Sequence, residues 1–258
     1  MIKFSANLGL LFTEYDLPDA IHAAHNAGFD AVECHWPYAY PSDVIKSALD
    51  ATGLRMLGIN TARGLAQKGE FGLSALPNRI TDARAAIDQA IDYARAIDCP
   101  HIHVMAGNCR DPQSQNVMIE NLQYAAAKAP DLTFMIEPIN TIDLPDYALN
   151  SVEQVALIIN TVAADNVKLM FDCYHIGKMG GDVLGLLKTH MPLIAHIQFA
   201  SVPDRGAPDL SPHNQGALDY NAVFKAITDL GYQNPLGAEY RPDGHTQDSL
   251  DWLRRARH

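Results

Sequence analysis

Short apolar runs alternate with longer amphipathic stretches along the whole chain. Eight of the runs have the length and the β-favouring composition of buried strands. The expected strands cover residues 2–8, 29–34, 54–60, 100–107, 133–137, 167–172, 193–200 and 235–240. The stretches between them have helical spacing, and two of the first helices end at glycines, Gly28 and Gly53.

The expected helices follow the strands one by one. They cover residues 16–27, 42–52, 79–97, 114–129, 151–163, 183–190, 220–230 and 246–254. The stretch 79–97 is the clearest, because apolar residues such as Ile80, Ile87 and Ile91 recur at helical spacing. Eight strand–helix units without a linker predict a (β/α)₈ TIM barrel, an α/β fold, with residues 1–258 as a single domain.

A doubly wound open sheet is the alternative architecture for such alternation. That fold often carries a glycine-rich phosphate-binding turn after its first strand. The segment ANLGLLFTEY that follows the first expected strand has no such turn. The sequence therefore favours the barrel.

Composition and charge narrow the classes of partner. The chain is 48% hydrophobic and 19% charged, as in ordinary globular proteins, and its formal net charge of -11 disfavours a nucleic-acid backbone as partner. No apolar run is long enough to cross a bilayer, and the first residues lack the pattern of a secretory signal. Cys34, Cys99, Cys109 and Cys173 lack metal-knuckle spacing, so we expect reduced thiols in a cytoplasmic protein without a membrane partner.

Oxygen-bearing side chains stand where the later strands end. The stretch TFMIEPIN runs from apolar residues into Glu137, and Pro138 helps to end the strand there. Asp172, Gln198 and Glu239 occupy the corresponding positions in the next three units. Because the carboxyl ends of all barrel strands meet at one rim, we expect these four side chains to converge.

Three converging carboxylates repel one another unless a cation lies among them. A hard divalent ion such as Mg²⁺ or Mn²⁺ prefers oxygen ligands, and an amide carbonyl is a suitable neutral fourth ligand. Any one of these acids alone would more often pair with an arginine or cap a helix. Their common register favours a metal site.

Two histidines lie close to these positions in sequence. His175 is three residues past Asp172, where it could donate a hydrogen bond to a substrate oxygen. His196 precedes Gln198 by two residues, so it should face the same side of its strand one layer deeper and support the site.

Four other histidines are interpreted structurally. His101 and His103 belong to a strand that we expect to lie apart from the acidic cluster, and we assign them to packing. His22 and His25 fall on an expected helix and are assigned to its surface. None of the four is expected to bind a metal.

Several segments taken together resemble one known family. The segments are SANLGLLFTEYD, AVECHWPY, IEPIN, FDCYH, HIQFASVPDRGAP and GAEY. In this set the chain resembles the hydroxypyruvate isomerase family of xylose-isomerase-like barrels, which includes 2-oxo-tetronate isomerases, over nearly its whole length.

The resemblance implies roles for the strand-end residues. Glu137, Asp172, Gln198 and Glu239 match divalent-metal ligands, and the two glutamates are implied as the acid–base pair. Substrate contacts are implied for the residues His175, Arg205 and Asn60.

Two loops depart from the family pattern. Ala207 stands where the loop after the seventh strand usually has an acid, and Ile59 precedes Asn60 where a histidine is usual. Arg63 and His213 are additional polar residues in these loops that could meet a substrate carboxylate, although exposed loop residues would look the same. The fold and metal chemistry therefore transfer better than the exact substrate.

The combined expectation is a metal-dependent aldose–ketose type isomerase acting on a small hydroxy-carbonyl acid or sugar through an enediolate. The alternatives are an epimerase or dehydratase of the same barrel type, and an inert sugar-binding barrel. An endonuclease IV-like zinc enzyme would need more histidine ligands and a basic groove. The sequence leaves three points open. They are the metal's identity, the order in which the glutamates act, and the oligomeric state, a homo-oligomer included.

Overall fold

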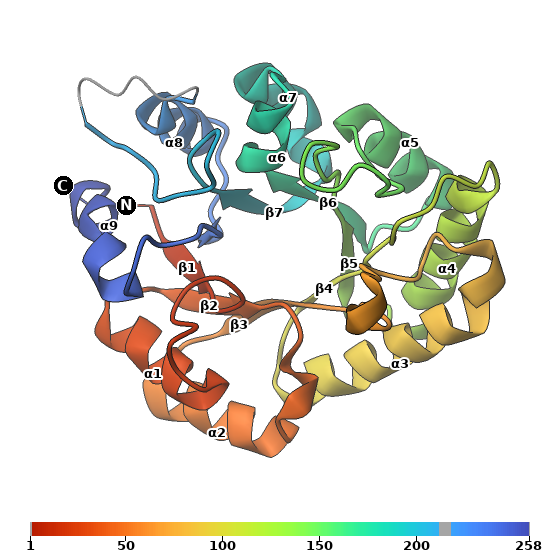
Figure 1. The fold of residues 1–258 in the computed structure, drawn as a ribbon, viewed down its shortest axis with the longest axis horizontal. Helices are drawn as coiled ribbons and strands as arrows, with labels where there is room; N and C mark the ends of the chain where they lie inside the picture. The colour runs from red at the N-terminus through yellow and green to blue at the C-terminus, as the bar shows by residue number, and fades with distance from the viewer. Residues whose placement is uncertain (1, 212–217, 258) are drawn as a thin grey trace.

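Eight parallel strands close into a barrel in the order in which they occur along the chain. The computed structural model describes residues 2–211 and 218–257. The strands are β1 (Phe4–Asn7), β2 (Ala31–Cys34), β3 (Met56–Asn60), β4 (His101–His103), β5 (Thr133–Ile136), β6 (Val167–Asp172), β7 (Ile194–Phe199) and β8 (Leu236–Ala238). Each strand pairs with its successor and β8 pairs with β1, which confirms the predicted TIM barrel (Figure 1).

Helices surround this barrel on the outside, as Figure 1 shows. They are α1 (Leu17–Asn26), α2 (Ser42–Thr52), α3 (Ile80–Ala96), α4 (Ser114–Lys128), α5 (Val152–Val162), α6 (Cys173–Lys178), α7 (Val183–His190), α8 (Tyr220–Asp229) and α9 (Asp251–Arg255). Short 3₁₀ segments are η1 (Pro37–Ala39), η2 (Ala66–Lys68), η3 (Pro77–Arg79), η4 (Met191–Leu193) and η5 (Thr246–Ser249). The predicted amphipathic face of α3 is buried, with Ile87 and Ile91 at its centre.

β4 is shorter than the predicted strand 100–107. Beyond Val104, whose N–H still donates to the Met135 carbonyl of β5, the backbone turns to other partners. The Met105 N–H donates to the Thr61 hydroxyl at 3.0 Å, and the Ala106 N–H donates to the Tyr147 hydroxyl at 3.0 Å. Gly107 then takes a positive φ of 95°, which favours glycine. Side chains of neighbouring loops therefore end the ladder, and the strand pattern alone could not indicate this.

The predicted C-terminal helix 246–254 is divided into η5 and α9. The Ser249 hydroxyl donates to the Thr246 carbonyl at 2.7 Å and tightens the first turn, and the buried Leu250 separates the two segments. The short helix α6, directly after β6, was not predicted. Its N-cap is Asp172, whose Oδ1 accepts the Tyr174 N–H at 2.8 Å.

An aromatic cluster packs where the barrel closes between β8 and β1. Phe4 of β1 and Phe199 of β7 contact Trp252 of α9 edge to face, with ring centroids 5.1 and 5.3 Å apart. The four cysteines are free thiols, three of them buried, as predicted. Among the described residues, no helix is long and apolar enough to cross a membrane.

The carboxyl ends of the later strands carry the predicted polar residues to one end of the barrel. Glu137 and Glu239 directly follow β5 and β8, and Asp172 is the last residue of β6. Gln198 lies on β7, where it pairs in register with Asp172. The regular parallel register of the strands therefore places these four residues at the same height along the barrel axis.

Candidate active site

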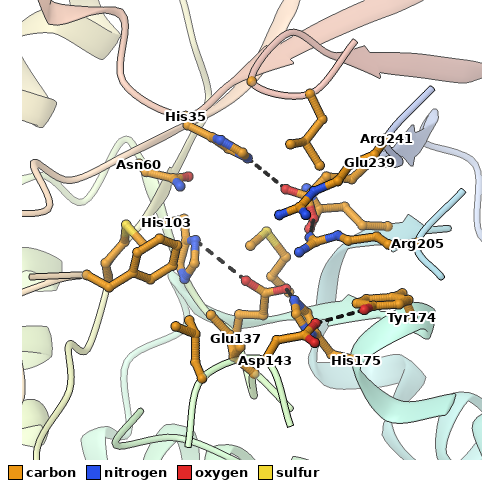
Figure 2. Close-up of a pocket in the computed structure, with 18 of the residues that line it drawn as sticks. His35, Asn60, His103, Glu137, Asp143, Tyr174, His175, Arg205, Glu239 and Arg241 are labelled. Carbon is orange, nitrogen blue, oxygen red and sulfur yellow. Dashed lines mark hydrogen bonds and ion pairs between the residues drawn. The ribbon is translucent and has the colours of Figure 1, made fainter. Parts of the chain in front are cut away.

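A cavity of about 650 Å³ opens at the carboxyl ends of the strands. Its floor is formed by residues on β6 and β7 and directly after β5 and β8, and its walls by loops such as those after β2, β3 and β7 (Figure 2). Glu137, Gln198 and Glu239 all line it, together with His175. This is the volume of a small-molecule site.

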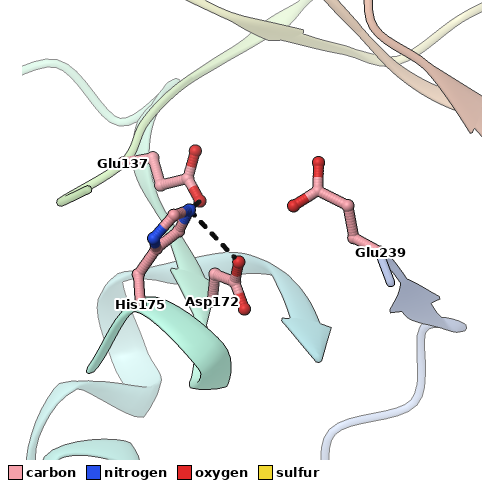
Figure 3. Close-up of side chains that lie close together, drawn as sticks. All are labelled: Glu137, Asp172, His175 and Glu239. Atoms are coloured by element: carbon pink, nitrogen blue, oxygen red, sulfur yellow. Dashed lines mark ion pairs between the residues drawn. The ribbon is translucent and has the colours of Figure 1, made fainter. Parts of the chain in front are cut away.

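Four titratable side chains meet at the bottom of the cavity. Glu137, Asp172, His175 and Glu239 each place one oxygen or nitrogen within 4.8 Å of the others, and all four are buried. Figure 3 shows Glu239 facing the other three across a gap. His175 Nε2 lies 3.5 Å from Asp172 Oδ2 and 3.7 Å from Glu137 Oε1.

Glu239 is held by donors from three elements. Its Oε1 accepts the Asn7 amide at 2.9 Å and lies 2.7 Å from His35 Nε2, and its Oε2 accepts Arg205 at 2.5 Å. Burial raises the pKa of Glu239, but Arg205 and His35 outweigh burial and lower it. The ionised carboxylate keeps one lone pair on Oε2 for a further partner.

Glu137 and Asp172 are in the opposite electrostatic situation. Burial, followed by the charges of Glu239 and Asp172, raises the pKa of Glu137 well above its ordinary value. Burial and the charge of Glu239 raise the pKa of Asp172 to about 7. Both acids would gain from a positive charge between them.

Glu33 on β2 orients Gln198 from below. Its Oε2 accepts the Gln198 amide at 3.4 Å and lies 2.6 Å from His196 Nε2. A carboxylate only accepts, so Gln198 must turn its NH₂ toward Glu33 and its Oε1 away from it. His196, two residues before Gln198 on β7, contacts the same Glu33 oxygen as the Gln198 amide.

A divalent cation fits this donor set. Glu137 Oε1, Asp172 Oδ2 and Gln198 Oε1 are buried and have no hydrogen-bond partner among residues 2–211 and 218–257. Buried polar atoms are normally satisfied, so three unpartnered oxygens on one cavity floor are a suitable set of donors for a cation. Oxygen ligands of this kind suit Mg²⁺ or Mn²⁺.

The expectation that His103 lies apart from the cluster is wrong. β4 pairs directly with β5, so His103 lines the cavity and its Nδ1 lies 3.9 Å from Glu137 Oε2. Burial lowers the pKa of His103 to about 3, which keeps the ring neutral. His101 is outside the cavity lining, and His22 and His25 are exposed on α1, as expected.

Sequence reasoning missed Glu33 and His35. Both lie in AVECHWPY, one of the segments that carry the family resemblance. Their signal was an acid and a histidine at the end of β2, the same strand-end position that singled out the other four. They were missed because β2 is far in sequence from β7 and β8, which it approaches through closure of the barrel.

Cationic side chains surround the cavity mouth. Arg63, Lys178 and Arg241 line it. Arg205 stacks on Tyr174, with its guanidinium carbon 4.9 Å from the ring centroid. Arg63 stacks on Trp36 at 4.8 Å. Within the described part of the chain, neither Arg63 nor Arg241 forms an ion pair with a carboxylate.

The other predicted substrate contacts have mixed outcomes. Asn60 lines the cavity, as do His175 and Arg205. His213 lies outside the described residues. The geometry thus brings an acidic floor and a cationic rim into one cavity.

The comparisons with known proteins agree with this architecture. Residues 21–256 match the family model described as a xylose isomerase-like TIM barrel. The chain is 42% identical to the Mus musculus protein named "Putative hydroxypyruvate isomerase", over 98% of this chain and 94% of that protein. It is 40% identical to the 2-oxo-tetronate isomerase of Cupriavidus necator, over 98% of each chain.

A solved structure extends the likeness. A crystal structure described as an AP endonuclease, family 2, from Brucella melitensis superposes with a TM-score of 0.93 at 34% identity and covers 99% of both chains. The fold and the cavity define a xylose isomerase-like barrel enzyme. Within that class, the chain belongs to the hydroxypyruvate isomerase family, and it is an isomerase.

Proposed function

We propose that the protein interconverts the ketone and aldehyde forms of a small 2-oxo or hydroxy-carbonyl acid, such as hydroxypyruvate or a 2-oxo-tetronate. The observation that carries the proposal is the set of buried oxygens on the cavity floor, which face one another beneath a cationic rim. The substrates named for the relatives at about 40% identity support the same class of compound.

Glu137, Asp172, Gln198 and Glu239 would hold a divalent cation, Mg²⁺ or Mn²⁺. When bound, such an ion supplies positive charge beside the carbonyl and hydroxyl oxygens of the substrate. The residues contribute three carboxylates and one amide oxygen that Glu33 already orients. The positive charge of the ion would offset the repulsion among the three buried carboxylates.

The two glutamates would move the proton. One carboxylate takes the proton from the carbon that bears the hydroxyl group, which leaves an enediolate. A proton returned to the neighbouring carbon, together with transfer of the hydroxyl proton to the former carbonyl oxygen, then completes the exchange of carbonyl and hydroxyl positions. Glu137 and Glu239 come from β5 and β8 and face each other across the gap in Figure 3, so they can address opposite faces of a flat enediolate.

The rim would bind the substrate's carboxylate. Arg63 and Arg241 carry positive charges without a carboxylate partner among the described residues, and both line the cavity. A guanidinium binds a carboxylate in bidentate geometry, which fixes the orientation of a short acid. The carbonyl end of the substrate would then reach the cavity floor.

Phosphodiester cleavage is the second candidate, because the similar Brucella melitensis structure is described as an AP endonuclease. A net charge of -11 opposes binding of a polyanionic duplex. Among the described residues, the grouped side chains on the cavity floor include a single histidine, whereas zinc hydrolases rely more on nitrogen ligands. Both observations favour the isomerase.

The decisive experiment is a panel of small oxo acids and ketoses incubated with the protein and Mg²⁺ or Mn²⁺ in D₂O. Isomerisation through an enediolate should incorporate deuterium at the carbon next to the carbonyl, and mass spectrometry would detect this. Exchange without isomerised product would favour an epimerase, and loss of water from the substrate would favour a dehydratase. Metal binding without any reaction would favour an inert barrel, and cleavage of an abasic DNA duplex would overturn the proposal.

A further inference from the structure

The side chain that orients His175 is Asn140, at the end of the TFMIEPIN stretch. We propose that Asn140 fixes the tautomer of His175, so that Nε2 carries the ring proton and acts as a hydrogen-bond donor inside the cluster, outside the metal's ligand set. The proposal rests on the proposed function and deepens it, because it assigns different tasks to the four grouped side chains. Asn140 is thus a positioning residue.

The orientation of the Asn140 amide follows from its backbone contacts. Its Oδ1 accepts two backbone N–H groups, from Ile142 at 3.1 Å and from Asp143 at 2.8 Å. These N–H groups can only donate, so the oxygen must be on that side. The amide is therefore not free to flip.

The NH₂ group of Asn140 consequently faces two acceptors. Nδ2 donates to Asp143 Oδ2 at 2.9 Å and lies 2.7 Å from His175 Nδ1. The backbone N–H of Asn140 also points at His175 Nδ1, at 3.4 Å. Because two N–H groups converge on Nδ1, this nitrogen must offer its lone pair and cannot carry a proton.

Asp143 is itself held in place. The Tyr174 hydroxyl donates to Asp143 Oδ2 at 2.7 Å, so this oxygen accepts from both Tyr174 and Asn140. The Asn140 amide is therefore fixed at both ends. Figure 2 shows Asp143 beside Tyr174 and His175 at the edge of the cavity.

The proton of the neutral His175 ring is then on Nε2. An acceptor at Nδ1, where two N–H groups converge, leaves the ring with a single proton, and that proton is on Nε2. Nε2 lies 3.5 Å from Asp172 Oδ2 and 3.7 Å from Glu137 Oε1. A protonated ring nitrogen has no lone pair for a metal, but it can donate to a substrate oxygen lying between these carboxylates.

The direct test is NMR spectroscopy of the metal-free protein labelled with ¹⁵N-histidine. Long-range ¹H–¹⁵N correlations distinguish the two tautomers, and H175Q assigns the resonances of His175. The expected result is the Nε2–H form in the wild-type protein. An Nδ1–H form would overturn the proposal whatever reaction the enzyme catalyses.

The variant N140D tests whether Asn140 is the cause. Aspartate is nearly isosteric and keeps an oxygen for the two backbone N–H groups, but it presents an acceptor to His175 Nδ1. We expect the tautomer to switch to Nδ1–H. The matched control is D143N, which changes the neighbouring side chain and should leave His175 in the Nε2–H form. Retention of Nε2–H in N140D, or a switch in D143N, would show that Asn140 is not the determinant.

Calorimetric titration with Mn²⁺ separates this proposal from the proposed function. H175Q should bind Mn²⁺ within about threefold of the wild-type affinity, whereas D172N, which alters a ligand, should bind at least about tenfold more weakly. Equal losses in both variants would make His175 a ligand and overturn its role as a donor. Absence of divalent-ion binding by the wild-type protein would overturn the proposed function. The tautomer of His175 would still be decided by the NMR experiment alone.

Discussion

Replacing Asp172 by asparagine should stabilise the metal-free protein at neutral and alkaline pH. Asp172 is 1% exposed, its Oδ2 has no hydrogen-bond partner in the described part of the chain, and burial and Glu239 raise its pKa from 3.8 to about 7. Asparagine keeps the Oδ1 acceptor that caps α6 but removes the charge. The variant therefore isolates the electrostatic cost of this carboxylate.

The sign of the effect follows from proton binding in the two states. Between pH 3.8 and about 7 the folded protein keeps the Asp172 proton that the unfolded chain has lost, so stability falls as the pH rises through this window. Above it, both states are ionised and the full cost applies, up to about 4 kcal/mol for a shift of this size. Below pH 3.8 both states are protonated and the cost disappears.

The assay is urea unfolding of wild type and D172N between about pH 4 and about pH 8, in the presence of a chelator. The free energy of unfolding of D172N relative to wild type should increase with pH, by up to about 4 kcal/mol. Saturating Mn²⁺ should narrow the difference, since a ligand at about a hundredfold its Kd stabilises the folded wild-type protein by about 2.7 kcal/mol. A difference that is independent of pH, or that grows toward acid, would refute the reasoning.

Three further predictions concern activity and metal binding. Glu137→Gln and Glu239→Gln should each lower kcat by about a hundredfold or more, because the base is lost while an oxygen is retained; steady-state kinetics with the reactive substrate of the panel would measure this. Arg63→Ala should raise KM for an acidic substrate by about tenfold with little change in kcat, because it removes a charged contact made equally in the ground and transition states. Glu33→Gln should weaken Mn²⁺ binding by about tenfold, measured by calorimetry, because an amide at this position allows Gln198 to turn its oxygen away from the metal site.

Each of these predictions has a contrary outcome. Near-normal turnover in both glutamine variants would remove the acid–base assignment. Arg110→Ala is the control for Arg63, since Arg110 pairs with Asp146 on the surface and its side chain is 77% exposed; an equal change in KM would mean that bulk charge, and not rim contact, is responsible. Unchanged Mn²⁺ affinity in the Glu33 variant would mean that Gln198 is not a ligand or is oriented by other contacts.

The sequence by itself determined the barrel and half of its active site. Alternating apolar and amphipathic runs specify strands and helices, and parallel strands joined through helices leave few other architectures. Glu137, Asp172, Gln198 and Glu239 could be found because each occupies the same position in its own unit, so local register alone places them at one level.

Only the tertiary structure decided which other residues reach the cluster. His35 meets Glu239 across 204 positions of sequence, and Glu33 meets His196 across 163, because closure of the barrel brings β2 near β7 and β8. His103 was misplaced for another reason, because β4 is the direct neighbour of β5 and so brings the ring to 3.9 Å from Glu137 Oε2. The tautomer of His175 likewise depends on the fold of the Asn140 loop, because the direction of a hydrogen bond depends on which groups face each other. Local periodicity of the sequence does not indicate which groups these are.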